Sequence, residues 1–395
     1  MKQLFPHERE QKRQALLGAV QQVQDILAAD VEEAERLRTL PSTSVLALRD
    51  SGLLALKTPT ELGGAEADPL IQIEIIEAVS YISPSAGWYL FIGAATAGLS
   101  GAFLPEAAVA EIFGGEHFPL VTGGGGFRPG ELVPIKGGYR LTGRWSWGSG
   151  IRHAEWLNIL GRINEESAGG TSEIRICVVP ARSVEIHDNW HVIGLSGTGS
   201  CDFSATDVFV PEHFTHGEFG RESPKRGGAL YRLGIPALLA NENAAFSLGV
   251  ARRALDEVVA LAQSKLRGYG KRTMLAQRGV FQRAVGEGTL RLRAARALLI
   301  EAYDRAWATA CKGEKLELKT QAELRAASAL VSDIAVKVAT DAFAYGAGTA
   351  IKLDSFLQRC FRDLHTADTH FLASDSSYEN YGQFLLGLPD ADPLA

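Results

Sequence analysis

The sequence predicts an α+β protein of three consecutive domains, helical at both ends and built from antiparallel strands in the middle. Apolar residues recur with helical spacing up to about residue 115, and the same spacing returns in long segments after residue 228. Between about residues 119 and 215 they instead form short extended runs punctuated by glycine. We therefore place the three domains at residues 1–118, 119–222 and 223–395.

The first domain is predicted to consist of helices separated by proline-containing turns. Leu16, Leu17, Val20, Val23, Ile26 and Leu27 belong to one apolar stripe, which indicates a helix packed on a core. Breakers containing proline interrupt the helical pattern at positions 41, 59 and 84.

The middle domain is predicted to be a small barrel or a sandwich. Its extended runs cover residues 139–142, 156–160, 173–180 and 205–211. No run is followed by a long helix, which disfavours the parallel sheet of a Rossmann fold.

The third domain is predicted to be a helical bundle. Long helical patterns cover roughly residues 246–265, 277–311 and 316–345, and a shorter one covers residues 357–370. Helices of this length pack most simply side by side.

Composition narrows the class of protein. The 395 residues contain 40 basic and 46 acidic side chains, for a net charge of −6 without a block of like charges, so nucleic acid is not an expected partner. The four cysteines lie far apart, which suits a reducing compartment. The N-terminus shows no signal peptide and no apolar stretch is long enough to span a bilayer, so we expect a soluble, cytoplasmic protein.

The segment from residue 143 to 153 holds the densest group of unusual side chains. On a regular strand Trp145 and Trp147 would project to the same face, followed on that side by Ser149. Such a flat wall beside a hydroxyl group suits a planar cofactor, whereas a barrel core with one wetted rim explains the same residues without a ligand. Both interpretations remain open from these residues alone.

Other motifs carry less information. The glycine-rich segments at residues 123–126, 190–200 and 346–350 match neither a Walker loop nor a dinucleotide fingerprint. His365 and His370 are five residues apart and do not share a helix face, so no metal site is expected. These patterns alone do not lead to a reaction.

Several motifs together resemble the acyl-CoA dehydrogenase superfamily over nearly the whole chain. They are residues 51–64 (SGLLALKTPTELGG), 139–150 (YRLTGRWSWGSG) and 359–364 (RCFRDL). Residues 137–150, 190–200 (WHVIGLSGTGS) and 362–370 (RDLHTADTH) look most like the oxygenase component of two-component flavin-dependent monooxygenases. The resemblance implies a central β-barrel, a C-terminal four-helix bundle and a homotetramer.

A dehydrogenase needs a carboxylate base beside the flavin, and the sequence tests this alternative. The two positions at which the family keeps this base fall on Phe371 and near Leu239, neither of which can accept a proton. Glu379 lies eight residues beyond the first position, and Glu242 lies three residues from the second. An acyl-CoA dehydrogenase with a displaced base, Glu379, therefore remains the alternative.

In the monooxygenase branch, the resemblance implies that reduced flavin (FADH2 or FMNH2) reacts with O2 to form a C4a-hydroperoxide that oxygenates the substrate. Trp147 would pack on the isoalloxazine, Ser149 would form a hydrogen bond at N5, and Thr122 would line the other side of the ring. Arg267 would reach the flavin phosphate or ring. His370 would hold the peroxide or accept a substrate proton, a task for a group that titrates near neutrality.

The resemblance also implies a small aromatic substrate and a separate NAD(P)H-flavin reductase. Members that hydroxylate phenols often carry a histidine where this sequence has about Ala95, so an indole-like heteroaromatic is as well supported as a phenol. Pocket candidates are Trp88, Tyr89, Phe91 and Thr96. N-oxygenation of an amine and a non-catalytic flavin-fold binding module are further alternatives, and FAD is not distinguished from FMN.

Overall fold

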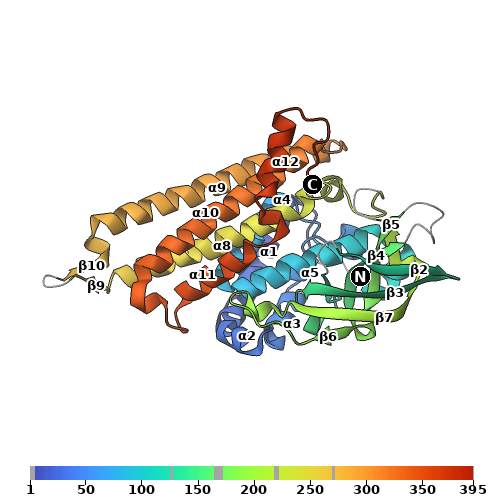
Figure 1. The fold of residues 1–395 in the computed structure, drawn as a ribbon, viewed down its shortest axis with the longest axis horizontal. Coiled ribbons are helices and arrows are strands. Elements are labelled where there is room, and N and C mark those ends of the chain that lie inside the picture. The colour runs from blue at the N-terminus through green and yellow to red at the C-terminus, as the bar shows by residue number, and fades with distance from the viewer. Residues whose placement is uncertain (1–4, 125–127, 164–171, 218–221, 269–271, 395) are drawn as a thin grey trace. The chain divides into compact units, whose positions relative to one another are not determined.

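The computed structural model describes residues 5–124, 128–163, 172–217, 222–268 and 272–394 (Figure 1). Helices come first along the chain, strands follow, and helices end it, as predicted. The chain divides into two compact units. The first unit contains Met1–Asp68, Trp88–Val192 and Ser196–Tyr231, and the second contains Pro69–Gly87, Ile193–Leu195 and Arg232–Ala395. The three domain boundaries expected from the sequence stay a prediction.

The helices of the first unit bury the faces that the sequence pattern indicates. They are α1 (Arg9–Ala29), α2 (Val31–Leu37), α3 (Ser42–Asp50), most of α5 (Pro84–Phe103), and α6 (Glu106–Phe113). Four members of the predicted stripe of α1 are buried, namely Leu16, Val20, Val23 and Leu27. Leu17 is only partly buried and Ile26 is 42% exposed, so the stripe is narrower than predicted. Since α5 is apolar on every side, it is buried along nearly its whole length.

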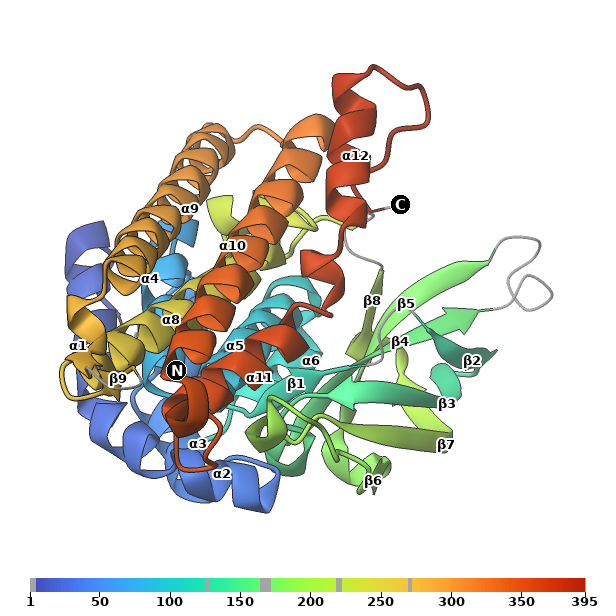
Figure 2. The same ribbon diagram turned by 60° about the vertical axis from the view of Figure 1, so that its left-hand side comes forward.

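The strands of the first unit form one sheet (Figure 2). The strands are β1 (Val121–Gly123), β2 (Gly130–Ile135), β3 (Gly138–Gly148), β4 (Trp156–Ile163), β5 (Glu173–Pro180), β6 (Glu185–His187), β7 (Cys201–Pro211) and β8 (Thr215–Gly217). Their order is β6-β7-β3-β2-β4-β5-β8, and β1 pairs with β4.

The sheet is mixed, which corrects the expectation of a purely antiparallel one. Most neighbouring strands are antiparallel, but β4 pairs in parallel with both β1 and β2. The parallel pairs arise because β1, β2 and β4 are not joined to one another by tight hairpins. Among the described residues the pairing runs from β6 to β8 without a pairing that closes the path.

The second unit contains helices that pack against one another. They are α4 (Pro69–Ile82), α8 (Ala237–Ala262), α9 (Gly279–Cys311), α10 (Leu318–Ala350), α11 (Phe356–Ala367) and α12 (Ser376–Leu385). The predicted helices near residues 277–311, 316–345 and 357–370 are confirmed, whereas α8 begins at Ala237, earlier than expected. Its first turns are buried and partly polar, so they lack the apolar stripe by which a surface helix is recognised.

Close backbone contact fixes α8 against α4. A Cβ atom on Gly249 of α8 would lie 3.0 Å from the Ser80 side chain and closer still to the Glu77 carbonyl oxygen. Only glycine permits this approach. Within the described parts of the chain, every helix is too short or too polar to cross a bilayer.

Candidate active site

The Ser149 hydroxyl group lies just beyond the end of β3, within a buried hydrogen-bonded row. The indole Nε1 of Trp88 donates to Ser149 Oγ at 3.2 Å. Ser149 Oγ and Ser200 Oγ are 2.9 Å apart, and Ser200 Oγ and Thr198 Oγ1 are 2.7 Å apart. All four side chains are nearly fully buried. The four groups form a continuous polar row inside the first unit.

A bulge in β3 brings Ser149 opposite Ser200. Trp145 pairs with Phe203, but Gly148 pairs with Cys201, so β3 contains one residue more than β7 over this stretch. Trp147 lies in this bulge with a φ of 62°, in the left-handed region that residues other than glycine rarely adopt.

The bulge also separates the two tryptophans, so the predicted flat wall of two rings is wrong. Trp145 is 1% exposed, stacks on Phe203 with ring centroids 5.5 Å apart, and donates from Nε1 to the Leu160 carbonyl oxygen at 3.1 Å. Trp147 is 63% exposed. A regular strand would have placed both on one face, and the bulge breaks that alternation. Of these two rings, that of Trp147, two residues before Ser149 in the chain, is the accessible one.

Thr122 supports the backbone of Ser149. Its hydroxyl group donates to the Ser149 carbonyl oxygen, and Thr122 itself is buried in β1. Thr96 of α5 donates to the Val121 carbonyl oxygen at 2.9 Å. The two threonines therefore connect α5 to β1 and β1 to the end of β3, which holds the Ser149 main chain from one side.

The aromatic pocket candidates pack around the same point. Trp88 and Phe91 meet edge to face with ring centroids 5.4 Å apart. A Cβ atom on Gly150 would lie 2.5 Å from Cδ2 of Tyr89, so this glycine lets the Tyr89 ring pack directly on the backbone next to Ser149. Burial raises the pKa of the Tyr89 phenol well above its usual range, so it stays protonated.

His370 belongs to the second unit, at the start of a short 3-10 turn after α11. Its Nδ1 accepts a hydrogen bond from the Leu372 backbone N–H at 3.4 Å, so the proton of the neutral ring is assigned to Nε2. Arg325 donates to the next carbonyl oxygen, that of Phe371, at 2.9 Å. Burial lowers the pKa of His370 to about 4. This corrects the expectation of a group that titrates near neutrality, because desolvation disfavours the imidazolium ion.

Arg267 and His370 are not brought together within one chain. Arg267 Nη2 donates to the Tyr345 carbonyl oxygen near the end of α10, at 3.1 Å. Arg325, which contacts Phe371, precedes Tyr345 by twenty residues of that helix. At 1.5 Å per residue this corresponds to about 30 Å. The two side chains therefore lie at opposite ends of α10.

The two carboxylates considered as displaced bases differ in environment. Glu379 is exposed in the first turn of α12, where water solvates its charge. Glu242 is fully buried in α8. Phe371 occupies the expected base position and carries no ionisable group.

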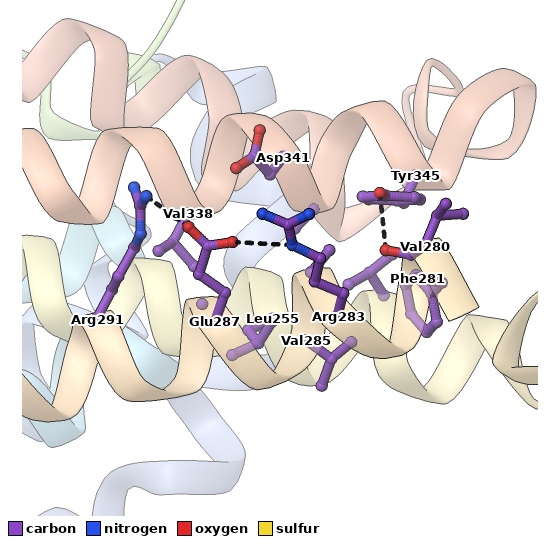
Figure 3. Close-up of a pocket in the computed structure, with 14 residues that line it drawn as sticks. Leu255, Val280, Phe281, Arg283, Val285, Glu287, Arg291, Val338, Asp341 and Tyr345 are labelled. Atoms are coloured by element: carbon purple, nitrogen blue, oxygen red, sulfur yellow. Dashed lines mark hydrogen bonds and ion pairs between the residues drawn. The ribbon is translucent and has the colours of Figure 1, made fainter. Parts of the chain in front are cut away.

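A groove along the helices of the second unit is a feature that the sequence patterns did not indicate (Figure 3). It has a volume of about 310 Å³ and is lined by residues of α8, α9 and α10. Glu287 pairs with Arg291 at 2.5 Å and with Arg283 at 3.8 Å, and Tyr345 donates to the Val280 carbonyl oxygen at 3.1 Å. Through Tyr345 the groove adjoins Arg267. Its residues are spread over three helices, so no local motif marks it.

Comparison with known proteins identifies the family. Two family models match the chain: "Acyl-CoA dehydrogenase, N-terminal domain" over residues 9–105 and "Acyl-CoA dehydrogenase, C-terminal domain" over residues 243–375. A "Pigment production hydroxylase" of Rhodococcus sp. is 32% identical, with 97% of this chain and 99% of the relative covered. An "Indole-3-acetate monooxygenase" of Pseudomonas putida is 30% identical, with 91% and 90% covered. The chain belongs to the acyl-CoA dehydrogenase superfamily.

Among solved structures, the chain is similar to XiaF from a Streptomyces species, which was solved with FADH2 and glycerol. The TM-score is 0.87 at 27% sequence identity, with 97% of each chain covered. The overall arrangement of helices and strands is therefore that of a protein with a bound reduced flavin.

The residues around Ser149 fit a flavin. Trp88 and Ser200 use two of the three hydrogen-bonding positions of the Ser149 hydroxyl group, which leaves one for a ligand atom. The exposed ring of Trp147, two residues earlier, offers a flat apolar surface. A hydroxyl group two residues along the chain from an accessible aromatic ring suits a tricyclic ring with polar edge atoms.

Ser200 and Thr198 are not among the site residues that the sequence predicts. Both lie in the glycine- and hydroxyl-rich segment at residues 190–200, which carries little information alone because it is not a phosphate loop. The signal was the pairing of this segment with the end of β3, and the bulge that decides this pairing cannot be read from residue types.

Proposed function

We propose that this chain is the oxygenase component of a two-component flavin-dependent monooxygenase that hydroxylates a small aromatic or heteroaromatic compound. The observation that carries the proposal is the buried Ser149 hydroxyl group, which Trp88 and Ser200 hold two residues along the chain from the exposed Trp147. The names of the two relatives, a pigment hydroxylase and an indole-3-acetate monooxygenase, support oxygen insertion into an aromatic substrate.

A bound reduced flavin would supply the electrons that activate O2, one atom of which would enter the substrate and the other leave as water. In the proposal Ser149 holds the N5 edge of the flavin, and Trp147 covers one face of its ring. Thr122 fixes the Ser149 carbonyl oxygen and so keeps the hydroxyl group in place. Because Trp88 and Ser200 also hold this hydroxyl group, little reorganisation is needed when a ligand binds.

His370 acts in the proposal as a neutral hydrogen-bond donor. With Nδ1 accepting from Leu372, the Nε2–H group is the one that donates to an oxygen atom of the substrate. A pKa of about 4 makes the ring a weak base at neutral pH, so donation is favoured over removal of a substrate proton.

The substrate class follows from the aromatic character of α5. Trp88, Tyr89, Phe91 and Thr96 are proposed to border the substrate, and Ala95 leaves no imidazole there to pair with a phenolate. This favours an uncharged ring such as an indole over a more acidic phenol. N-oxygenation of an amine is a less supported outcome of the same site.

Assembly and partners belong to the same proposal. A separate NAD(P)H-flavin reductase supplies the reduced flavin, FADH2 or FMNH2, and the protein acts in the cytoplasm as a homotetramer. In such a tetramer Arg267 contacts a flavin that another copy holds, because in its own chain it lies about 30 Å along α10 from the His370 segment. For the fold, the corresponding proposals are that the sheet closes into a barrel and that the C-terminal helices pack as a four-helix bundle.

The decisive experiment supplies reduced flavin from an added reductase and follows a panel of indoles and phenols under isotopically labelled dioxygen. Labelled oxygen in one ring product supports the proposal. If the label appears only in hydrogen peroxide for every substrate, the monooxygenase assignment fails. Reduction of a dye by an acyl-CoA thioester would instead establish the dehydrogenase alternative.

A further inference from the structure

Three hydroxyl groups lie in a row behind the proposed flavin contact. Ser149 Oγ is 2.9 Å from Ser200 Oγ, which is 2.7 Å from Thr198 Oγ1. The row is anchored at one end by Trp88, whose Nε1–H group can only donate. These residues are at most 6% exposed, so bulk water does not compete for their bonds.

The strand register determines which hydroxyl groups meet in this row. The pairing of Gly148 with Cys201, continued by one residue, places Ser149 opposite Ser200. Without the bulge at Trp147, the pairing of Trp145 with Phe203 would have placed Ser149 opposite a glycine instead. A strained φ at a non-glycine residue therefore brings two hydroxyl groups together.

Counting protons and lone pairs shows what the row can do. A serine hydroxyl group has one proton and can accept two hydrogen bonds. Trp88 always occupies one acceptor position on Ser149 Oγ. Ser200 Oγ either accepts a hydrogen bond from the Ser149 hydroxyl group or donates one to its second acceptor position. In the first case Ser149 can accept a hydrogen bond from a ligand, and in the second case it can donate one. If Ser200 accepts a hydrogen bond from Ser149, its own hydroxyl group donates one to Thr198 Oγ1.

The two redox states of flavin need opposite arrangements. Reduced flavin carries a proton on N5 and donates a hydrogen bond there, whereas oxidised flavin accepts one at N5. We propose that Ser200 and Thr198 tune the site toward reduced flavin: Ser149 donates a hydrogen bond to Ser200 Oγ and Ser200 donates one to Thr198 Oγ1, so that Ser149 Oγ accepts a hydrogen bond from N5–H. This inference rests on the proposed function, since it requires that Ser149 contacts N5. Ser200 and Thr198 are positioning residues, because they act through Ser149.

Removal of Ser200 tests the two states separately. In Ser200→Ala, the Ser149 hydroxyl group can still donate to N5 of oxidised flavin. It loses only the hydrogen bond that Ser200 donated to one of its acceptor positions. With reduced flavin bound, its proton would be buried without a partner, and a buried donor is costlier to leave unpaired than an acceptor. We expect the preference for reduced over oxidised flavin to fall by about tenfold. For a two-electron couple this equals a shift of about 30 mV in the midpoint potential of the bound flavin.

The experiment measures the dissociation constants of oxidised FAD in air and reduced FAD under anaerobic conditions, with FMN in parallel, and the midpoint potential of each complex. Thr198→Val is the second variant, which removes the acceptor for the Ser200 proton with little change in shape and should shift the ratio in the same direction. Ser196→Ala is the matched control, because its hydroxyl group lies in the same segment but donates to Val192 at 3.3 Å, outside the row. Ser200→Thr restores a hydroxyl group and should restore the ratio.

Each outcome decides one claim. A lower preference for reduced flavin in Ser200→Ala and Thr198→Val, but not in Ser196→Ala, supports the inference. An unchanged ratio in both variants, with flavin still bound by the wild type, overturns the inference and leaves the proposed function standing. If Ser200→Ala does not fold, Thr198→Val alone decides. If the wild type binds neither form of either flavin, the proposed function fails and this inference fails with it.

Discussion

Substitution of Gly150 by alanine tests how tightly the residue after Ser149 is constrained. Gly150 has a φ of 72°, and an L-residue in this left-handed region costs about 1–2 kcal/mol. The added Cβ atom would lie 2.5 Å from Cδ2 of the buried Tyr89 ring, and overpacking of this kind costs about 1–3 kcal/mol more. We therefore expect Gly150→Ala to lower the free energy of unfolding by about 2–5 kcal/mol.

Gly137 provides the matched control. Its φ is 84°, and a Cβ atom there would meet nothing within 4 Å. Gly137→Ala should cost only the backbone penalty of about 1–2 kcal/mol, so the difference between the two variants isolates the contact with Tyr89. The measurement is urea unfolding followed by tryptophan fluorescence and far-ultraviolet circular dichroism.

A double variant makes the reasoning refutable. In a Tyr89→Leu background the ring edge is absent, so Gly150→Ala should cost no more than Gly137→Ala does in the wild type. If Gly150→Ala and Gly137→Ala cost the same in the wild-type protein, the Tyr89 ring does not constrain this turn. Flavin affinity measured on the same variants should fall for Gly150→Ala only, because this residue directly follows Ser149.

Three further predictions follow from burial and charge. Trp147→Ala should weaken flavin binding and leave the urea midpoint nearly unchanged, since the ring is 63% exposed. Trp145→Ala should instead lower the free energy of unfolding by about 3–5 kcal/mol. Similar stability losses in both variants would contradict the assignment of Trp145 to the core. His370→Ala should bind reduced flavin nearly as well as wild type in anaerobic titration but release more hydrogen peroxide per substrate hydroxylated, and full coupling in this variant would remove His370 from the mechanism. Burial lowers the pKa of His216 to about 4 from 6.5, so the contribution of the neutral ring to stability is fully present above pH 6.5 and is lost as the pH falls toward 4. His216→Asn should flatten this part of the stability profile by up to roughly 3 kcal/mol. An identical profile in the variant would show that His216 does not titrate on unfolding.

The elements that could be predicted are those whose signal is local and periodic. The stripe in α1 and the long patterns of α9, α10 and α11 depend on side chains within a few turns of one another, and these helices lie where the pattern placed them. The apolar strand segments were recognisable for the same reason. The parallel pairing of β4 was not predictable, because it depends on which distant strands meet.

The site was predictable in its residue types but not in its geometry. The hydroxyl group of Ser149 and the ring of Trp147 were singled out from residue type and spacing, yet the alternation rule placed Trp145 beside them. One additional residue in β3 reversed that placement and also created the contact with Ser200. A bulge depends on the pairing of β3 with β7, which lies far along the chain, so it leaves no local pattern.

The residues assigned to the proposed site share one electrostatic property that separates oxygen transfer from dehydrogenation. Ser149, Trp147 and Thr122 carry no charge, and His370 is neutral at pH 7 because its pKa is about 4. A dehydrogenase must ionise a carbon acid and therefore keeps a carboxylate next to the flavin, whereas Phe371 stands at that position here and Glu379 is exposed. If no group of the site titrates near neutrality, the coupling of flavin oxidation to hydroxylation should be independent of pH between about 6 and 8. A sigmoidal dependence centred in that range would show that an ionising group takes part, and its loss in His370→Ala would identify the group as His370 with a pKa raised by the bound flavin.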